Sequence, residues 1–72
     1  MTNTNKLKAA IVERGMNQEK LASALGISRT ALNNKLNGKT YFTDDELTKM
    51  KCILDLDNDR FLLIFFDNNV DV

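Results

Sequence analysis

Four polar side chains that can form specific hydrogen bonds or methyl contacts fall close together in the chain, namely Arg29, Thr30, Asn33 and Asn34. An arginine can donate two hydrogen bonds to O6 and N7 of a guanine, and an asparagine can pair in a similar way with N6 and N7 of an adenine. The methyl group of a threonine can contact that of a thymine. Side chains of these types can therefore recognise bases if one structural element presents them together.

The residue types that most enzymes and metal sites need are scarce in this chain. It contains no histidine and a single cysteine, Cys52, so neither a zinc site nor a disulfide framework can be assembled within one chain. The acidic residues near the carboxyl end have no recognisable spacing for general acid–base catalysis, and no nucleophile stands with a base. We therefore expect a protein that is not an enzyme and that has no metal, no cofactor and no small-molecule ligand.

The element that would present the four polar side chains is a helix-turn-helix. One helical pattern covers about Gln18 to Leu25, and a second covers about Ser28 to Leu36, with Gly26 at the break. Asn17 and Ser28 stand where a short side-chain oxygen can accept a hydrogen bond from a first-turn amide. The apolar positions that the two helices would share are Leu21, Ala22, Leu25, Ile27, Ala31, Leu32 and Leu36.

Charge is divided unevenly along the chain, although the net formal charge is zero. Residues 1–43 carry seven basic and two acidic side chains, a net charge of +5, and residues 44–72 carry three basic and eight acidic ones, a net charge of −5. The first part should attract polyanions and the second should repel them. Because the basic part contains the helix-turn-helix pattern, the charge distribution favours binding to nucleic acid.

Two further helices are expected on either side of this pattern. The first covers about Thr4 to Arg14, and the second begins at a capping box in which Thr43 and Glu46 bond each other's backbone amides. The apolar stripes of these helices are Leu7, Ala10 and Ile11 in the first and Leu47, Met50 and Leu54 in the second. In the loop between the helix-turn-helix and the capping box, Tyr41 and Phe42 are expected to fold back over the core.

Residues 57–66 have a pattern that fits more than one structure. Asp57 could cap a fifth helix, but the apolar run from 61 to 66 has no period that separates helix from strand. We favour a helix that meets a second copy of the chain, because a small domain has limited interior for such a run. The residues expected at this dimer interface are Phe61, Ile64 and Phe65. The alternative is a core helix that closes the domain, and farther on Val70 and Val72 could extend a strand.

Length and hydropathy indicate one small domain. That domain would comprise residues 1–72. The chain has no apolar run of 18 residues, and its first residues lack the apolar stretch of a signal peptide. A single thiol also suits a reducing compartment. These features predict a cytoplasmic protein with no membrane partner.

The segment from about Asn5 to Leu54 resembles the phage repressor and Cro family, also called the XRE-type helix-turn-helix family. The residues that carry the resemblance are Gln18, Leu21, Ala22, Leu25, Gly26, Ile27, Ser28, Leu32, Gly38 and Lys39. The resemblance implies a domain core at residues 5–54 and a carboxyl-terminal extension at residues 55–72 for packing or dimerisation, in a protein of a bacterial or phage-infected cell. The resemblance implies an all-α fold, a compact four- to five-helix lambda-repressor-like domain. It also implies that the second helix of the motif enters the major groove of double-stranded DNA, while the first lies across the backbone.

The resemblance also implies roles for individual residues. Base contacts would come from Arg29, Thr30, Asn33 and Asn34, and phosphate contacts from Gln18, Lys35, Asn37, Lys39 and Thr40. Lys6 and Lys8 are weaker candidates for phosphate contacts.

Two functions remain open from the sequence. The first is a sequence-specific transcription regulator, a phage or prophage repressor of the Cro type that binds an inverted-repeat operator as a homodimer. The second is a protein-interaction module on the same fold, such as an antirepressor or an antitoxin. The acidic, apolar-rich carboxyl-terminal part supports this second function.

Overall fold

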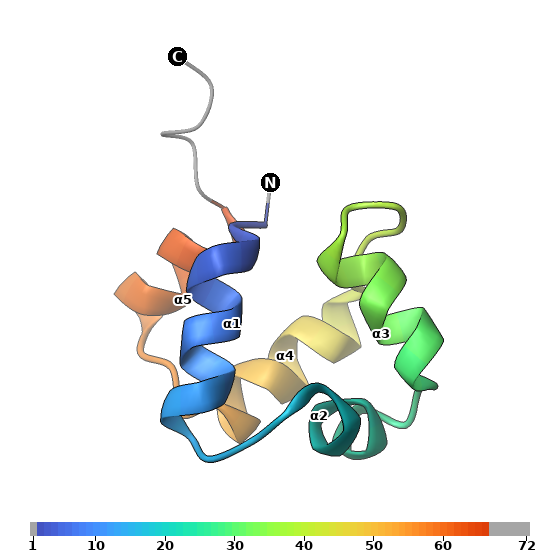
Figure 1. Cartoon of the computed structure of the whole chain (residues 1–72). Coiled ribbons are helices and arrows are strands. Elements are labelled where there is room, and N and C mark those ends of the chain that lie inside the picture. Colours follow the sequence, from blue (N-terminus) through green and yellow to red (C-terminus); the bar gives the residue numbers. More distant parts are fainter. Residues whose placement is uncertain (1, 67–72) are drawn as a thin grey trace.

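Five helices make up the part of the chain that the computed structural model describes, residues 2–66. They are α1 (Thr4–Glu13), α2 (Gln18–Leu25), α3 (Arg29–Leu36), α4 (Asp44–Ile53) and α5 (Asn58–Phe65). Figure 1 shows α1 and α5 side by side, α3 on the opposite side of the molecule, and α2 across the base. Within residues 2–66 there is no strand, so the expected all-α fold is confirmed there.

Every helix begins at a short polar residue whose side-chain oxygen accepts a hydrogen bond from the amide three positions later. These capping residues are Asn3, Asn17, Ser28, Thr43 and Asp57. Each has an extended backbone, as the residue before a helix must. The predicted capping box of Thr43 and Glu46 is present, with Glu46 accepting from the Thr43 amide at 2.9 Å. Local sequence therefore fixes where the helices start.

Helices α1 to α4 also end in one common way. Each is followed by a residue with positive φ, and the next amide donates to the carbonyl five positions earlier. The positive-φ residues are Gly15 at 67°, Gly26 at 73°, Gly38 at 79° and Asp55 at 52°. This is the geometry of a Schellman ending, which satisfies carbonyl groups that the last turn leaves free. Three of these ends use glycine, and the fourth places an aspartate in a conformation that costs most other side chains energy.

One core receives side chains from all five helices. The buried apolar residues are Leu7, Ala10, Ile11, Leu21, Ala22, Leu25, Leu32, Leu36, Met50, Leu54, Leu56, Ile64 and Phe65. They include every apolar position expected in α1 and α2, whereas three other expected core residues, Ile27, Ala31 and Leu47, are half-buried. The radius of gyration is 11.3 Å, close to the roughly 11 Å expected for a compact chain of this length. None of the described helices is long and apolar enough to span a bilayer.

The structure makes α5 a helix, which confirms the favoured prediction for residues 58–65. It packs against α1, and the Asn3 amide donates to the Ile64 carbonyl. Thr4 connects the same end of α1 to α3, since its hydroxyl donates to the Leu36 carbonyl at 2.7 Å. The core therefore extends beyond residue 54, where we had expected it to end. The strand considered for Val70 and Val72 lies outside the described residues.

Candidate nucleic-acid interface

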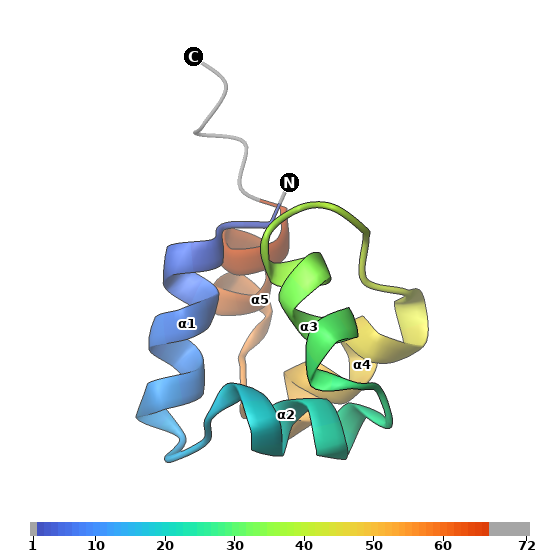
Figure 2. The same ribbon diagram turned by 45° about the vertical axis from the view of Figure 1, so that its right-hand side comes forward.

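The turn between α2 and α3 consists of only three residues, Gly26, Ile27 and Ser28. Gly26 takes the left-handed conformation, and the Ile27 amide donates to the Ala22 carbonyl at 3.0 Å. Ser28 then caps α3 by accepting from the Ala31 amide. Because the chain reverses so quickly, α3 rises steeply from the end of α2 (Figure 2). This arrangement of two packed helices is a helix-turn-helix.

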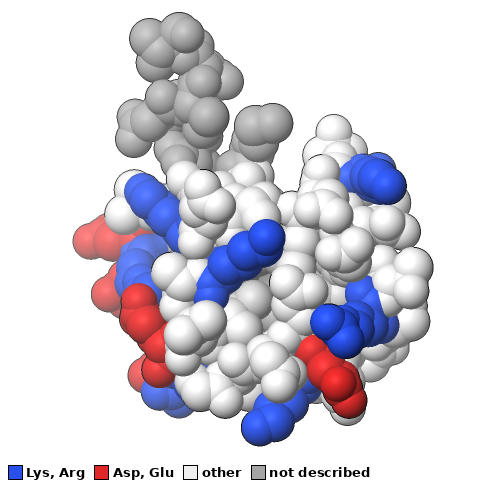
Figure 3. Space-filling model, viewed as in Figure 1, with Lys and Arg blue, Asp and Glu red and all other residues white. Residues whose placement is uncertain are grey.

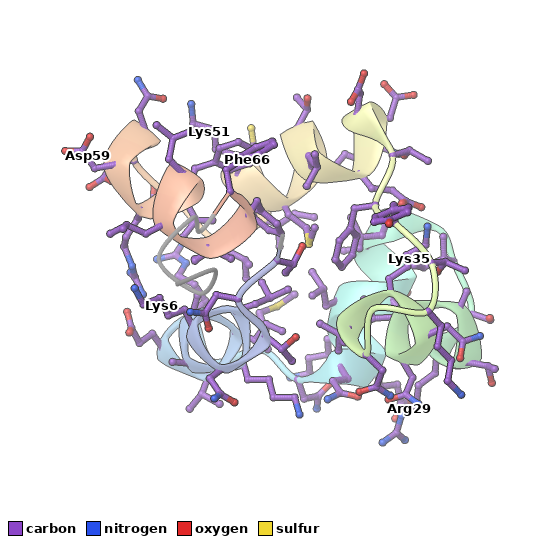
Figure 4. All side chains as sticks on the ribbon, turned by 90° about the horizontal axis from the view of Figure 1, so that it is seen from above. Lys6, Arg29, Lys35, Lys51, Asp59 and Phe66 are labelled. Atoms are coloured by element: carbon purple, nitrogen blue, oxygen red, sulfur yellow. The ribbon has the colours of Figure 1, made fainter. Side chains whose placement is uncertain are left out.

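The two faces of α3 differ sharply in chemistry. Leu32 and Leu36 point into the core with at most 1% of their surface exposed. Arg29, Thr30 and Asn33 are exposed. Residues four apart lie on one helix face, about 6 Å apart along the axis, so Arg29 and Asn33 share a face. In Figure 4 the Arg29 side chain extends away from the body of the protein.

Other predicted contact residues lie around this face, with different exposure. Asn34 and Gln18 are half-buried, Gln18 in the first turn of α2. Asn37, Lys39 and Thr40 are exposed in the segment that follows α3. We call residues 37–43 the connecting loop, because they join α3 to α4. Helix α3 and the connecting loop thus carry most of the predicted polar residues, and Gln18 lies on α2, which packs against α3.

Lys35 does not project from this region as predicted. Its ammonium group donates to Glu46 Oε1 at 2.9 Å and to the Tyr41 carbonyl at 2.9 Å, and it lies 5.8 Å from the centre of the Phe42 ring. Only 13% of the Lys35 side chain and 12% of the Glu46 side chain are exposed. In Figure 4 Lys35 lies inside the connecting loop. The ammonium group on which the expected phosphate contact depends is therefore paired within the protein in this conformation.

The carboxyl group of Glu46 is affected by this environment. Burial raises its pKa, but the hydrogen bond from the Thr43 amide and the hydrogen bond and charge of Lys35 lower it by more. The net result is a pKa below the usual range of a glutamate. The Glu46 carboxyl is therefore ionised at neutral pH.

The expectation for the two adjacent aromatic residues of the loop is half right. Phe42 packs against the core, and its ring meets that of Phe65 edge to face at 5.9 Å. Tyr41 does not fold back, because 90% of its surface is exposed. In an extended segment neighbouring side chains point to opposite sides, so only one of the pair can face inward. Tyr41 is thereby an exposed side chain of the connecting loop, like Lys39 and Thr40, although no DNA contact was expected of it.

Acidic side chains are absent from the sequence between Glu19 and Asp44, which includes most of α2, all of α3 and the connecting loop. Figure 3 shows basic side chains over α1, over α3 and over the loop, with acidic ones mainly at the edge near α5 and at one spot near α2. Lys6 and Lys8 are exposed on α1, apart from α3. No group of three potential metal ligands occurs among residues 2–66. Helix α3 and the connecting loop thus contain basic and no acidic side chains.

The residues expected at a dimer interface are in large part core residues. Ile64 and Phe65 are 1% and 4% exposed, and Phe61 is half-buried against the core. A side chain buried within one chain cannot also contact a second chain, so the prediction is wrong for Ile64 and Phe65. The exposed apolar residues of this region are Leu62, Leu63 and Phe66, at 53%, 44% and 51%. The core helix considered as the alternative describes α5 better.

The fold and this region define a small helical domain built around a helix-turn-helix with a polar outer face. Residues 2–68 match the family described as "Protein of unknown function (DUF739)". Since the match covers most of the chain, the protein belongs to this family. A comparison with curated proteins finds no match.

Proposed function

We propose that this protein is a sequence-specific DNA-binding transcription regulator, a small phage or prophage repressor of the Cro type. The observation that carries the proposal is the outer face of α3, where Arg29, Thr30 and Asn33 are exposed on a helix whose other face is anchored in the core. An α-helix fits the major groove, and these side chain types can discriminate among bases there. The resemblance to the XRE-type helix-turn-helix family supports the same role.

Binding would use two kinds of contact. Side chains on α3 would read base edges, while Gln18 in the first turn of α2 and Asn37, Lys39 and Thr40 of the connecting loop would bond phosphates. Lys35 is left out of the phosphate set because its ammonium is paired with Glu46. A homodimer would place two copies of α3 in successive major grooves about 34 Å apart, so the operator would be an inverted repeat. Occupation of the operator would then block transcription without any catalytic step.

The experiment that tests this proposal is selection of preferred sites from random duplex DNA by the purified protein at moderate salt. We expect enrichment of an inverted repeat. The matched control is a variant with both Arg29→Ala and Asn33→Ala, which should stay folded, since both side chains are exposed, but should lose the preference. An enriched motif without symmetry would retain DNA binding and contradict the dimer. No enrichment by the folded wild-type protein would contradict the proposal.

A second candidate function is a protein-interaction module, such as an antirepressor or antitoxin. The observation that favours it is the exposed apolar set Leu62, Leu63 and Phe66 on a domain whose core is already complete. Apolar side chains exposed together on a small protein are often contact sites for other proteins. This candidate predicts no DNA enrichment in the selection.

A further inference from the structure

The connecting loop is held at both of its ends by one residue of α3. At the start of the loop, the Gly38 amide donates to the Lys35 carbonyl at 3.2 Å, and the Lys39 amide donates to the Asn34 carbonyl at 2.9 Å. At the far end, the Lys35 ammonium donates to the Tyr41 carbonyl. Backbone and side chain of Lys35 therefore enclose the segment that carries Lys39 and Thr40.

The same ammonium group connects the loop to α4. Glu46 Oε1 accepts from Lys35 and also from the Thr43 amide, both at 2.9 Å. One carboxylate oxygen thus joins the last turn of α3, the last residue of the loop and the first turn of α4. The other two ion pairs among residues 2–66, Arg14–Asp55 and Arg60–Glu13, have side chains that are at least 40% exposed. Lys35–Glu46 is the shielded pair of the three.

A shielded ion pair is a poor source of stability, because the loss of hydration offsets most of the attraction between the charges. Its hydrogen bonds, however, require one particular geometry. We propose that Lys35 and Glu46 are positioning residues, which hold the connecting loop in one conformation beside α3. In that conformation the loop would contact the DNA backbone while side chains of α3 contact the bases. This inference rests on the proposed function and assigns no direct DNA contact to either residue.

Loop positioning and long-range electrostatics predict opposite effects of Glu46→Gln on DNA affinity. Glu46→Gln removes a negative charge near the DNA-binding region, which by long-range attraction alone should strengthen binding. Glutamine at this position can still accept from the Thr43 amide, so the capping box and the start of α4 are retained. Its uncharged oxygen would bond the Lys35 ammonium more weakly than the carboxylate does. If the ion pair positions the loop, Glu46→Gln should instead weaken binding to the selected operator about tenfold, the equivalent of one charge-assisted hydrogen bond.

The matched control is Asp45→Asn. Asp45 is the preceding residue in the same first turn, is exposed, and undergoes the same change in charge. It should leave operator affinity unchanged or raise it. Circular dichroism of both variants checks that they are folded. The slope of affinity against salt should become shallower by about one phosphate contact in Glu46→Gln, which a purely structural role would not produce. Equal or tighter binding by folded Glu46→Gln, as in Asp45→Asn, would overturn the proposal.

Backbone order parameters of residues 39–42, measured by nuclear magnetic resonance without DNA, separate this inference from the proposed function. We expect them to fall in Glu46→Gln and not in Asp45→Asn. If the wild-type protein selects no DNA, the proposed function fails, and a fall in the order parameters would still support loop positioning. Order parameters that match the wild type in Glu46→Gln would overturn loop positioning whatever the DNA result.

Discussion

Helices α3 and α5 have the same length and the same number of buried side chains, but their outer faces differ in chemical character. Each has eight residues, and each places two large apolar side chains in the core, Leu32 and Leu36 from α3 and Ile64 and Phe65 from α5. The outer face of α3 carries arginine, threonine and asparagine, whereas that of α5 exposes Leu62 and Leu63 in addition to polar residues in its first turn. The buried faces of the two helices are therefore equivalent. What separates the helices is that α5 also exposes large apolar side chains, whereas the exposed side chains named on α3 can all form hydrogen bonds with a partner.

The strongest way to break this comparison is to remove a buried side chain from α5. Ile64→Ala should lower the free energy of unfolding by about 2–5 kcal/mol, because it leaves a cavity in the core. Urea denaturation measures the change, and Leu62→Ala, at a position that is 53% exposed, is the control and should cost much less. Similar costs at both positions would show that α5 does not pack as described.

The second test changes the outer face of α3. Arg29→Ala should weaken operator binding by about 1–3 kcal/mol and relax the preference at one base pair, because a bidentate contact to guanine is lost. The free energy of unfolding should hardly change, since the side chain is exposed. Affinity measurements on the selected site and on single-base variants give the result. An unchanged base preference would remove Arg29 from the base-reading set.

The third test compares the ends of α2 and α4, which have the same hydrogen bonds but different residues. Gly26→Ala places a side chain at φ 73° and should cost about 1–2 kcal/mol of stability. An added Cβ would meet no atom within 4 Å, so the cost comes from the backbone alone. Asp55→Gly should go the other way and stabilise by about 0.5–1 kcal/mol. Thermal unfolding measures both, and a destabilised Asp55→Gly would point to a role for the aspartate side chain.

The smallest expected effect is the pH dependence that comes from Glu46. Because its pKa is lower in the folded than in the unfolded protein, its contribution to stability is complete above the usual glutamate pKa of about 4.3 and is lost as pH falls through the folded value. Between about pH 5 and about pH 3, the wild-type protein should therefore lose more stability than Glu46→Gln. Parallel losses would mean that the pair contributes nothing to this titration.

The helix-turn-helix was predictable because its signals are local. Asn17 and Ser28 each cap a helix within three residues, and Gly26 supplies the backbone that ends α2. Their positions reproduce the expected bounds of α2, and α3 starts one residue later than expected because Ser28 is its cap. The exposed positions of Arg29 and Asn33 follow from helical spacing once Leu32 and Leu36 are inside.

The environment of Lys35 and the packing of α5 were not predictable in this way. Lys35 meets Glu46 across the connecting loop, so its ion pair depends on a loop conformation that no short pattern specifies. In α5 the apolar run has no period, and Ile64 and Phe65 are buried by parts of the chain distant in sequence, which include α1 and Phe42. Tyr41 and Phe42 show the same limit, because composition does not tell which of two aromatic neighbours faces the core.

The pairing of α1 with α5 also determines when the core can be completed during synthesis of the chain. Helix α1 leaves the ribosome first of the five and α5 last, yet the Asn3 amide bonds the Ile64 carbonyl, and both helices contribute to one core. At translation rates of about 5–20 residues per second, the delay between these helices is about 2–9 s. Until α5 emerges, α1 keeps an apolar stripe without its final neighbour. The domain therefore reaches its native packing only after translation of α5. During that interval the exposed apolar stripe of α1 can take part in aggregation.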